Sequence, residues 1–364
     1  MKLVCTKKNL HQGLMTVSHI VESGNTLPVL NNILFKTDKG RLKLSSTNLE
    51  IAINTWVGGK IEEEGGLTIP ARLVNDYINN VTAEKITIST QNQTLFLEAE
   101  KAKSHIKGLS SDEFPLIPNA NNEIYVRVEG KLLEEAIKEV SFASAFSETQ
   151  PEISGVLFSF EGKTLTMVAT DRYRLAETKI ELLGGTTSSK SVIIPARAVN
   201  EVGRVTNKGV VDIYLTEGQV MFKTEDAELL SRLIDGQYPD YKQIIPQNFV
   251  TEAEVERSEF IQSLKAASLF ASASNNIELD LAPQNKQVVI KSQSSQTGDS
   301  EIRLDAKMTG PKNSIVFNYR YIIECLNNLP DEKVVLKAID STSPAQIVPF
   351  GRGNHLYIVM PIKI

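Results

Sequence analysis

The chain has 364 residues, of which 41% are hydrophobic and 23% charged, and its net charge is −5. This composition is typical of a folded protein with room for two or three domains, and it excludes a disordered or low-complexity chain. No apolar run approaches the roughly 20 residues that span a bilayer. The N-terminal residues lack the apolar segment of a signal peptide, and two cysteines do not indicate a disulfide framework. We therefore expect a cytoplasmic protein with no membrane association.

In chain order, the first predicted element is an amphipathic helix with Leu10, Leu14, Val17 and Val21 in one stripe. Alternating strands are predicted next, over residues 33–37, 41–46 and 49–57. Ile69-Pro70-Ala71-Arg72 ends a further strand and begins a second helix, and strands then follow over residues 86–89, 94–99 and 103–109.

The same order of elements returns about 120 residues later. A helix carries Leu132, Leu133, Ala136, Ile137 and Val140. Strands follow over residues 155–160, 164–170 and 174–180. Ile194-Pro195-Ala196-Arg197 repeats the earlier tetrapeptide at the start of another helix. Strands over residues 210–216, 219–224 and 227–234 complete this second module.

A third module repeats the order again. Its first helix is predicted to carry Phe260, Ile261, Leu264 and Leu269 on one face. Strands follow over residues 277–282, 287–292 and 301–308. Phe317-Asn318-Tyr319-Arg320 is a degenerate third copy of the tetrapeptide, and the chain ends on a strand over residues 357–360. Self-similarity at a fixed period indicates a repeat architecture.

The repeat predicts an α+β fold of three tandem modules, each with two helices packed on antiparallel sheets. Polar segments at 119–122 and 247–248 mark the module boundaries, so the predicted domains are 1–121, 122–247 and 248–364. Exposed sheet edges invite aggregation. We therefore expect neighbouring modules to pair edge to edge, and closure into a ring would remove the free edges.

Four motifs carry a resemblance to a known family. They are residues 26–34 (Thr-Leu-Pro-Val-Leu-Asn-Asn-Ile-Leu), residues 169–176 (Ala-Thr-Asp-Arg-Tyr-Arg-Leu-Ala), residues 231–241 and the terminal Val359-Met360-Pro361-Ile362. In this order and spacing they resemble the bacterial sliding clamp, the beta subunit of the replicative DNA polymerase. The resemblance runs the whole length of the chain.

The resemblance implies a head-to-tail homodimer whose six alike domains form a ring around double-stranded DNA. Such a ring has no catalytic activity and needs no cofactor or metal. It tethers the replicative DNA polymerase and other proteins that carry a clamp-binding motif, and an ATP-driven clamp loader opens it. A heterologous interface of this kind closes into a ring when the rotation between copies allows it.

The resemblance also implies a groove for partner peptides between the second and third modules. Its expected residues are Thr170, Arg172, Tyr173, Arg174, Leu175, Pro239, Ile244, Asn318, Tyr321, Ser343, Pro344, Ile358, Val359, Met360, Pro361 and Ile362. An apolar slot with a few polar groups suits a short linear motif. The alternative is that some of these residues are core at a module junction.

The sequence departs from the commonest family form at three places. Arg172-Tyr173 stand where many members have a small residue followed by His, and Gln243 stands where some carry Arg. Gly24-Asn25 precede the first motif where the family often has an Arg. The polar rim of the groove and one DNA contact are expected to differ accordingly.

DNA-facing residues are predicted from the repeat. Arg72, Arg197 and Arg320 occupy one position in the three modules, at the start of the second helix, and Lys265 lies on the first helix of the third. Basic side chains at such positions can hold phosphates without reading bases. Further candidates are Lys7, Lys8, Lys131, Lys138 and Arg204. The alternative is an ordinary solvated helix face, since Glu134, Glu135, Glu139 and Glu201 lie on the same helices.

The subunit interface is expected where the last module of one copy meets the first of another. By family correspondence, Leu269 and Phe270 would pack near Ile106; an intramodule core role is the alternative.

Enzyme classes find little support. The four histidines show no metal-ligand spacing, and no phosphate-binding loop or nucleophile elbow is present. Asp171 beside Arg172 and Arg174 is interpreted as a strand-end ion pair. Two other functions stay open: a ring-shaped adaptor that gathers proteins without DNA, and a nuclease that uses Asp171 and Asp235.

Overall fold

A computed structural model describes residues 1–21, 27–118, 123–147, 149–186, 188–206 and 208–363. Gly24, Asn25, Thr26 and the boundary segment 119–122 lie outside the described residues, as does Ile364. Contacts divide the chain into two compact units. Unit 1 joins Met1–Lys131 to Glu201–Leu233, and unit 2 joins Leu132–Asn200 to Ile234–Ile364.

Unit 1 is built on a five-stranded and a nine-stranded antiparallel sheet, in the orders β5-β1-β7-β8-β9 and β10-β6-β2-β3-β4-β18-β17-β16-β11. Their bounds are β1 Lys2–Thr6, β2 Asn32–Asp38, β3 Arg41–Thr47, β4 Ile51–Val57, β5 Gly59–Glu63, β6 Gly66–Pro70, β7 Lys85–Gln91, β8 Thr94–Ala99, β9 Ala102–Lys107, β10 Leu109–Ser110, β11 Val126–Glu129, β16 Val210–Leu215, β17 Gln219–Lys223 and β18 Ala227–Arg232.

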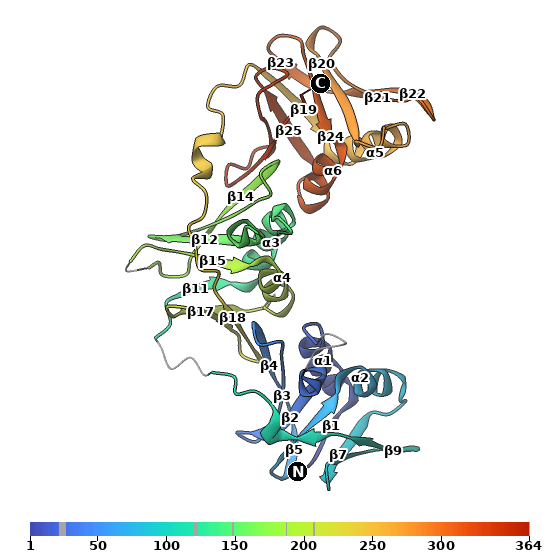
Figure 1. The fold of residues 1–364 in the computed structure, drawn as a ribbon, viewed down its shortest axis with the longest axis vertical. Coiled ribbons are helices and arrows are strands. Elements are labelled where there is room, and N and C mark those ends of the chain that lie inside the picture. Colours follow the sequence, from blue (N-terminus) through green and yellow to red (C-terminus); the bar gives the residue numbers. More distant parts are fainter. Residues whose placement is uncertain (22–26, 119–122, 148, 187, 207, 364) are drawn as a thin grey trace. The chain divides into compact units, whose positions relative to one another are not determined.

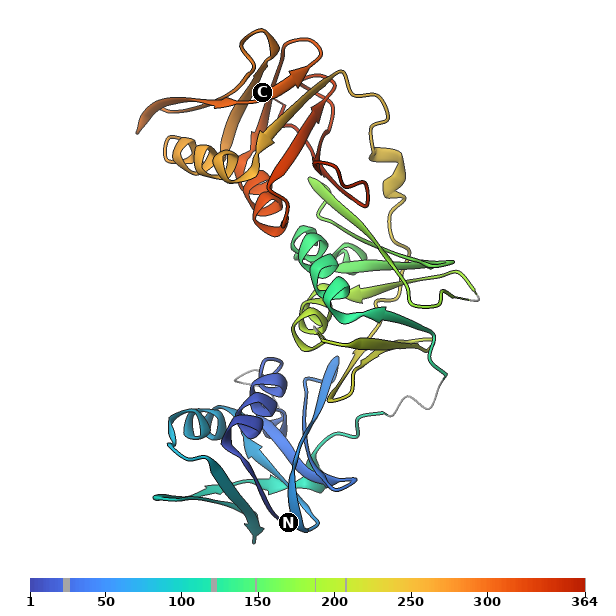
Figure 2. The ribbon, with the colours of Figure 1, turned by 180° about the vertical axis from the view of Figure 1, so that it is seen from behind.

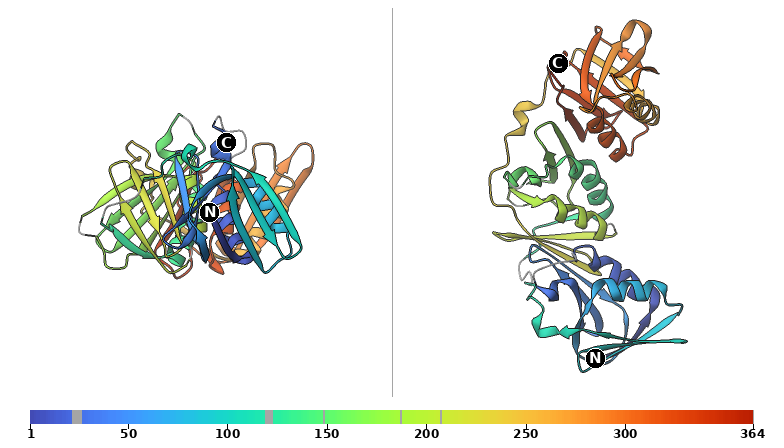
Figure 3. Two further views of the ribbon diagram at one scale, coloured as in Figure 1. Left: turned by 90° about the horizontal axis from the view of Figure 1, so that it is seen from below. Right: turned by 45° about the vertical axis from the view of Figure 1, so that its right-hand side comes forward.

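Helices α1 (Lys7–Ser18) and α2 (Ala71–Asn80) lie side by side against these sheets (Figures 1 and 3). α1 buries Leu10, Leu14 and Val17, and α2 buries Val74 and Ile78, as their spacing predicts. Gly13 lets α1 approach β4 closely, because a Cβ there would lie 2.5 Å from the Val57 side chain.

Unit 2 contains a nine-stranded sheet in the order β15-β12-β13-β14-β27-β26-β25-β19-β23 and a four-stranded sheet in the order β22-β21-β20-β24. The bounds are β12 Gly155–Glu161, β13 Thr164–Thr170, β14 Arg174–Glu181, β15 Lys190–Pro195, β19 Thr251–Glu256, β20 Asn276–Ala282, β21 Gln287–Ser294, β22 Gly298–Asp305, β23 Lys307–Thr309, β24 Asn313–Asn318, β25 Lys333–Ala338, β26 Ala345–Pro349 and β27 His355–Val359.

The remaining helices are α3 (Gly130–Val140), α4 (Ala196–Val205), α5 (Arg257–Ser268) and α6 (Tyr319–Asn328). α5 and α6 pack together against the sheets of unit 2 (Figure 2). The three-module prediction is confirmed in its elements, since each module has two helices and two sets of strands.

Pairing between modules is also confirmed. Strand β4 of the first module pairs with β18 of the second, and β14 of the second pairs with β27 of the third. We call these strand pairs the first junction (β4 with β18, in unit 1) and the second junction (β14 with β27, in unit 2). Because each nine-stranded sheet runs through a junction, the middle module contributes strands to both units.

Some predicted elements need correction. Leu49 lies in a turn with φ +75°, so β4 begins only at Ile51. The strand predicted over residues 301–308 is two strands, β22 and β23. Leu269 follows α5 and is 73% exposed, so it is not on the buried stripe of that helix. Val21 likewise lies beyond the end of α1.

Candidate partner-binding site and interfaces

The turn between β13 and β14 is held by its own side chains. The Thr170 hydroxyl donates to the carbonyl of Arg174 at 2.7 Å, and Asp171 Oδ1 accepts from the backbone N–H groups of Tyr173 and Arg174, each at 3.0 Å. Arg172 has φ +77°, in the left-handed region. Asx turns can hold a residue there, although the conformation is strained for a residue with a Cβ. The turn therefore presents Arg172 and Tyr173 to solvent.

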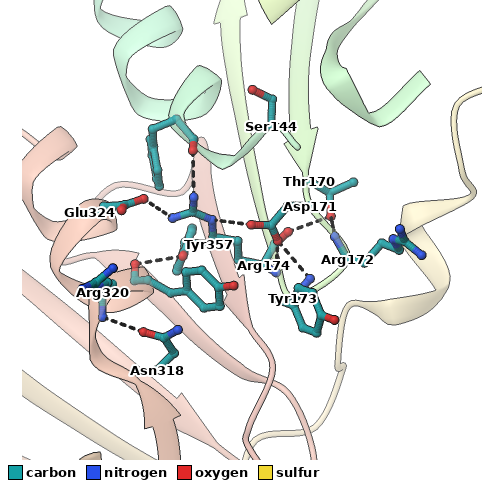
Figure 4. A network of polar contacts seen from close by, with 12 residues as sticks. Ser144, Thr170, Asp171, Arg172, Tyr173, Arg174, Asn318, Arg320, Glu324 and Tyr357 are labelled. Carbon is teal, nitrogen blue, oxygen red and sulfur yellow. Dashed lines mark hydrogen bonds and ion pairs between the residues drawn. The ribbon is translucent and has the colours of Figure 1, made fainter. Parts of the chain in front are cut away.

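Arg174 lies beneath this turn and is the centre of a polar network (Figure 4). Its guanidinium donates to Asp171 Oδ2 at 3.0 Å, to the carbonyl of Phe142 at 3.0 Å and to Glu324 of α6. Its carbon Cζ also lies 4.7 Å from the ring centroid of Tyr321. Burial disfavours the charged form, but Tyr357, Glu324 and Asp171 outweigh it and raise the pKa of Arg174. The ion pair predicted between Asp171 and its neighbouring arginine is confirmed.

Aromatic side chains form a wall beside this network. Tyr173, which is 62% exposed, stacks on Tyr321 with ring centroids 6.5 Å apart. The buried Tyr357 hydroxyl donates to the carbonyl of Tyr321 at 2.9 Å, and the Asn318 side chain caps α6 by accepting from the N–H of Arg320. The wall is thus partly exposed but fixed from below.

The C-terminal segment docks against the same place. The N–H of Met360 donates to the carbonyl of Tyr173 at 2.8 Å, and the N–H of Ile362 donates to Val316 at 2.8 Å. Met360, Pro361 and Ile362 are half-buried. Chain ends fray unless they are tied down, so these two bonds give the apolar end a fixed position.

The linker between the second and third modules packs behind the turn. Tyr241 joins Val168, Leu175 and Ile358 in one apolar cluster, and its hydroxyl donates to Glu177 at 2.6 Å. Burial and the Glu177 carboxylate raise the pKa of Tyr241. The linker therefore covers the sheet, while Pro239 and Ile244 remain on its exposed side.

Ten of the predicted groove residues fall into two groups. Tyr173, Tyr321, Met360, Pro361 and Ile362 lie together with exposed surface, whereas Thr170, Arg174, Leu175, Ile358 and Val359 are buried and act beneath it. Ser343 and Pro344 are half-buried before β26. The carboxylate of Asp340 accepts from backbone and hydroxyl groups of Thr342 and Ser343, which lowers its pKa to about 2.

Three residues of this network were not predicted: Phe142, Glu324 and Tyr357. Only one had a signal in the sequence, because Glu324 occupies the position of Glu201 in the repeat, 123 residues earlier, and both lie on the second helix of their modules. A carboxylate that recurs at one position of the repeat could have been predicted to bind a cation where two modules meet.

The predicted DNA-facing arginines share one structural position. Arg72, Arg197 and Arg320 are each the second residue of their helix (α2, α4 and α6) and are exposed. Lys265 is exposed on α5.

The other basic candidates are more restricted. Arg204 donates to Glu201 and to the carbonyls of Met15 and Thr16 at the C-terminal end of α1, so it is engaged within unit 1. Lys138 pairs with Glu134 at 2.6 Å, and Lys7 donates to the carbonyl of Asn79. The interpretation of Glu139 as a solvated residue is wrong, since it is buried.

The predicted subunit contacts lie near two sheet edges. In the described residues, β9 ends the five-stranded sheet of unit 1 and β22 ends the four-stranded sheet of unit 2. Ile106 on β9 is buried against its own sheet, opposite Leu95, whereas Leu269 is exposed and Phe270 is half-buried. β9 carries Lys103 and Lys107, while β22 carries Asp299, Glu301, Arg303 and Asp305.

In the described part of the chain, a metal site would need a group of His, Cys, Asp or Glu side chains. No group of three or more His, Cys, Asp or Glu side chains there could hold a metal ion. Both oxygens of Asp171 accept hydrogen bonds that hold the turn and Arg174 in place. No described helix is long and apolar enough to cross a membrane.

Three family descriptions match consecutive parts of the chain. They are the DNA polymerase III beta subunit N-terminal domain over residues 1–118, its central domain over 127–240 and its C-terminal domain over 242–363. The beta sliding clamp of Synechococcus elongatus is 31% identical over the full length of both chains. That of Staphylococcus aureus is 28% identical, with 93% of each chain covered.

Solved structures agree along the whole chain. The DNA polymerase sliding clamp from Bacillus subtilis has a TM-score of 0.93 at 28% identity, covering 100% of this chain and 99% of that one. The Pseudomonas aeruginosa sliding clamp bound to griselimycin has a TM-score of 0.94 at 25% identity, with 100% of each chain covered.

Proposed function

This chain belongs to the bacterial DNA polymerase III beta subunit family and is a DNA sliding clamp, and we propose that it works as a closed homodimer around duplex DNA in the cytoplasm. It has no catalytic activity of its own. Its three clamp domains are proposed to be residues 1–121, 122–247 and 248–364. The observation that carries the proposal is the threefold repeat of two helices on antiparallel sheets, matched over its full length by sliding clamps.

We propose that DNA contacts the helices α2, α4 and α6. Arg72, Arg197 and Arg320 support this, because one exposed cation recurs at the second position of three equivalent helices. Contacts of this kind attract phosphates regardless of sequence and permit sliding. Processivity then comes from encirclement, with affinity a minor factor.

The dimer is proposed to close through β9 of one copy and β22 of the next. Both lie at sheet edges in the described part of the chain, and their net charges are opposite, since β9 carries Lys103 and Lys107 while β22 carries Asp299, Glu301 and Asp305 with one cation, Arg303. Leu269 and Phe270 would add apolar contact beside that edge.

Partner proteins, including the polymerase and the loader, are proposed to bind the wall formed by Tyr173, Tyr321 and the segment 360–362. Its half-buried apolar surface and fixed polar rim suit short peptide motifs. Deleting residues 360–364 should abolish polymerase binding and leave the dimer intact. Unchanged binding would remove this assignment.

Encirclement is tested by loading the protein onto nicked circular DNA with a clamp loader and then linearising the circle. A closed clamp stays on circles and leaves linear DNA through its ends. Retention on linear DNA with open ends contradicts the proposal, binding of proteins without retention on circles indicates an adaptor, and strand cleavage indicates a nuclease. The mass in solution should be about twice that of the 40.2 kDa chain.

The dimer edge has its own test. Lys103→Glu with Lys107→Glu should give monomers at a concentration where the unaltered chain is dimeric. Combining that chain with a second carrying Asp299→Lys and Glu301→Lys should restore the ring, because one interface then pairs the reversed charges and the other is unaltered. Dimers that persist in the first variant would place the interface elsewhere.

A further inference from the structure

A polar cleft lies at the first junction, inside unit 1, with a volume of about 740 Å³. Its walls are α1, the end of β4, Lys208 and Gly209 beyond α4, and the turn between β17 and β18; Figure 1 labels α1, β4 and β18. The cleft sits at the end of β4 opposite to the β3–β4 turn. Sites for small ligands and peptide segments have volumes of roughly 300–1,000 Å³.

The second junction has the same backbone at the corresponding place. Thr55 of β4 donates to the carbonyl of Asp226 at 2.9 Å, and Thr178 of β14 donates to that of Asn354 at 3.4 Å. The strand registers correspond as well, since Thr55 lies opposite Ala227 and Thr178 opposite His355. Side chains at the two places can therefore be compared position by position.

In unit 2 this place is filled by the chain itself. The turn between β26 and β27 inserts Arg352, whose guanidinium donates to Glu139 of α3 at 2.7 Å and pairs with Asp331 at 3.0 Å. The buried His355 lies beside them, with Nδ1 3.6 Å from Glu139. A peptide turn with a basic side chain thus occupies a site with two acidic groups on its wall.

In unit 1 the side chains that fill this place in unit 2 are replaced by other residues, and an acidic position on the wall becomes basic. Thr16 stands at the position of Glu139, Ala227 at that of His355 and Lys208 at that of Asp331. The turn over residues 224–226 is also shorter than that over residues 350–354. These differences leave the cleft open and replace its two carboxylates with a hydroxyl and an ammonium group.

Polar side chains line the cleft without intramolecular bonds in the described part of the chain. They are the amides of Asn9 and Gln12, the Lys208 ammonium and the Glu225 carboxylate, all exposed. Amide side chains can pair with both the N–H and the C=O of a peptide backbone. Lys208 is positioned to pair with an anion.

We propose that this cleft binds a peptide turn of a partner protein, with an acidic side chain on Lys208 in the place that Arg352 takes in unit 2. Lys208 stands where Asp331 pairs with Arg352, so the charge at that wall position is reversed, and the side chain that fits it is acidic. Asn9 and Gln12 bind the backbone of the turn. This surface is separate from the partner-binding wall at residues 173, 321 and 360–362.

The probe for this proposal comes from the chain itself. A cyclic peptide of residues 349–355 carrying Arg352→Glu (Pro-Phe-Gly-Glu-Gly-Asn-His) should bind the full chain, and the same peptide with arginine should bind at least 10-fold more weakly. The single tryptophan, Trp56, lines the cleft, so its fluorescence reports binding and calorimetry provides a second measurement.

Two variants locate the site. Lys208→Glu, at an exposed position that should not affect folding, should reverse the preference between the two peptides, while Tyr173→Ala should change neither affinity. Equal affinity for both peptides, no binding of the glutamate peptide at about 1 mM, or an unchanged preference in Lys208→Glu would each overturn the proposal.

Discussion

The first and second junctions have one backbone plan but different interiors. Each pairs two strands of neighbouring modules antiparallel, and each begins with a turn in which a Thr hydroxyl and an Asx side chain bind the same backbone groups: Thr47 and Asn48 in one, Thr170 and Asp171 in the other. Beyond these turns the first junction is a polar cleft, whereas the second is filled by buried ion pairs.

The carboxylates on the second helices illustrate the difference. Glu201 in the first junction holds Arg204, which caps the carbonyls at the end of α1. Glu324 in the second holds Arg174, which comes from the strand. The glutamate recurs at the same position of the repeat, but the arginine that it binds comes from the same helix in the first junction and from a strand in the second. Backbone hydrogen bonds therefore define the repeat, and each junction can acquire its own side-chain chemistry.

The largest contrast should appear on removing Glu139. Glu139→Ala leaves Arg352 without its nearer carboxylate and Thr178 with only the more distant carbonyl of Asn354 as acceptor. Breaking a buried pair in this way costs about 3 kcal/mol. The matched variant Thr16→Ala, at the same position of the first junction, should cost less than about 0.5 kcal/mol.

Native-state hydrogen exchange of the β14 and β27 amides measures this cost locally, which avoids treating the whole chain as one two-state unit. Equal costs for the two variants would mean that the ion pairs add nothing to the second junction.

Removing the arginine of each junction should have a smaller effect. Arg174→Ala should destabilise the second junction by about 2 kcal/mol, because Asp171 keeps its backbone donors and Glu324 is partly exposed to water. It should also weaken binding of partner peptides, since Tyr321 loses the cation beside its ring. Arg204→Ala should cost about 1 kcal/mol without affecting those peptides. A loss of peptide binding in both variants would contradict the prediction that only Arg174 supports the partner-binding wall.

The helices and the recurring arginines could be predicted from the sequence. Apolar spacing located α1 to α6, and the repeated Ile-Pro-Ala-Arg, with its degenerate third copy Phe-Asn-Tyr-Arg, placed the three arginines at one helical position. The strands β1, β5, β11 and β19 were not predicted. β1, β11 and β19 are short segments that directly precede the first helix of a module, and β5 is mostly exposed. Their pairing partners give them their structure.

The chemistry of the junctions could not be predicted. Glu139 and Arg352 are 213 residues apart in the chain, and nothing in α3 distinguishes Glu139 from its exposed neighbours Glu134 and Glu135. Burial depends on which turn reaches that helix, and the length of the turn over residues 350–354 has meaning only once β14 and β27 are paired. The Tyr173 and Tyr321 wall was accessible through family resemblance alone.

Acid should weaken the second junction selectively. Burial, assisted by Arg352, lowers the pKa of His355 to about 3. The unfolded chain, with an ordinary histidine pKa near 6.5, therefore binds the proton first, and stability falls as the pH drops below that value. The loss from pH 6.5 to 5.5 should be about 1 kcal/mol.

The groups that face the His355 imidazole are Glu139, Arg352 and Thr178. The variant must therefore leave these three residues unchanged. His355→Leu should remove this part of the pH dependence, as seen by exchange at β27, and leave β18 unaffected, where Ala227 stands at the same position. An identical acid response in His355→Leu would assign the effect to other groups.

The smallest effect tests the shared backbone. Leu49 and Arg172 have φ +75° and +77° at the same place in their turns, a conformation that costs a residue with a Cβ about 1 kcal/mol or more. Glycine removes this strain but adds freedom to the unfolded chain, so Leu49→Gly and Arg172→Gly should each stabilise by about 0.5 kcal/mol. Thermal melting and exchange at β4 and β14 measure the gain. Because the two turns make the same hydrogen bonds, the two gains should be equal; a gain at one turn alone would show that side-chain contacts differ there as well.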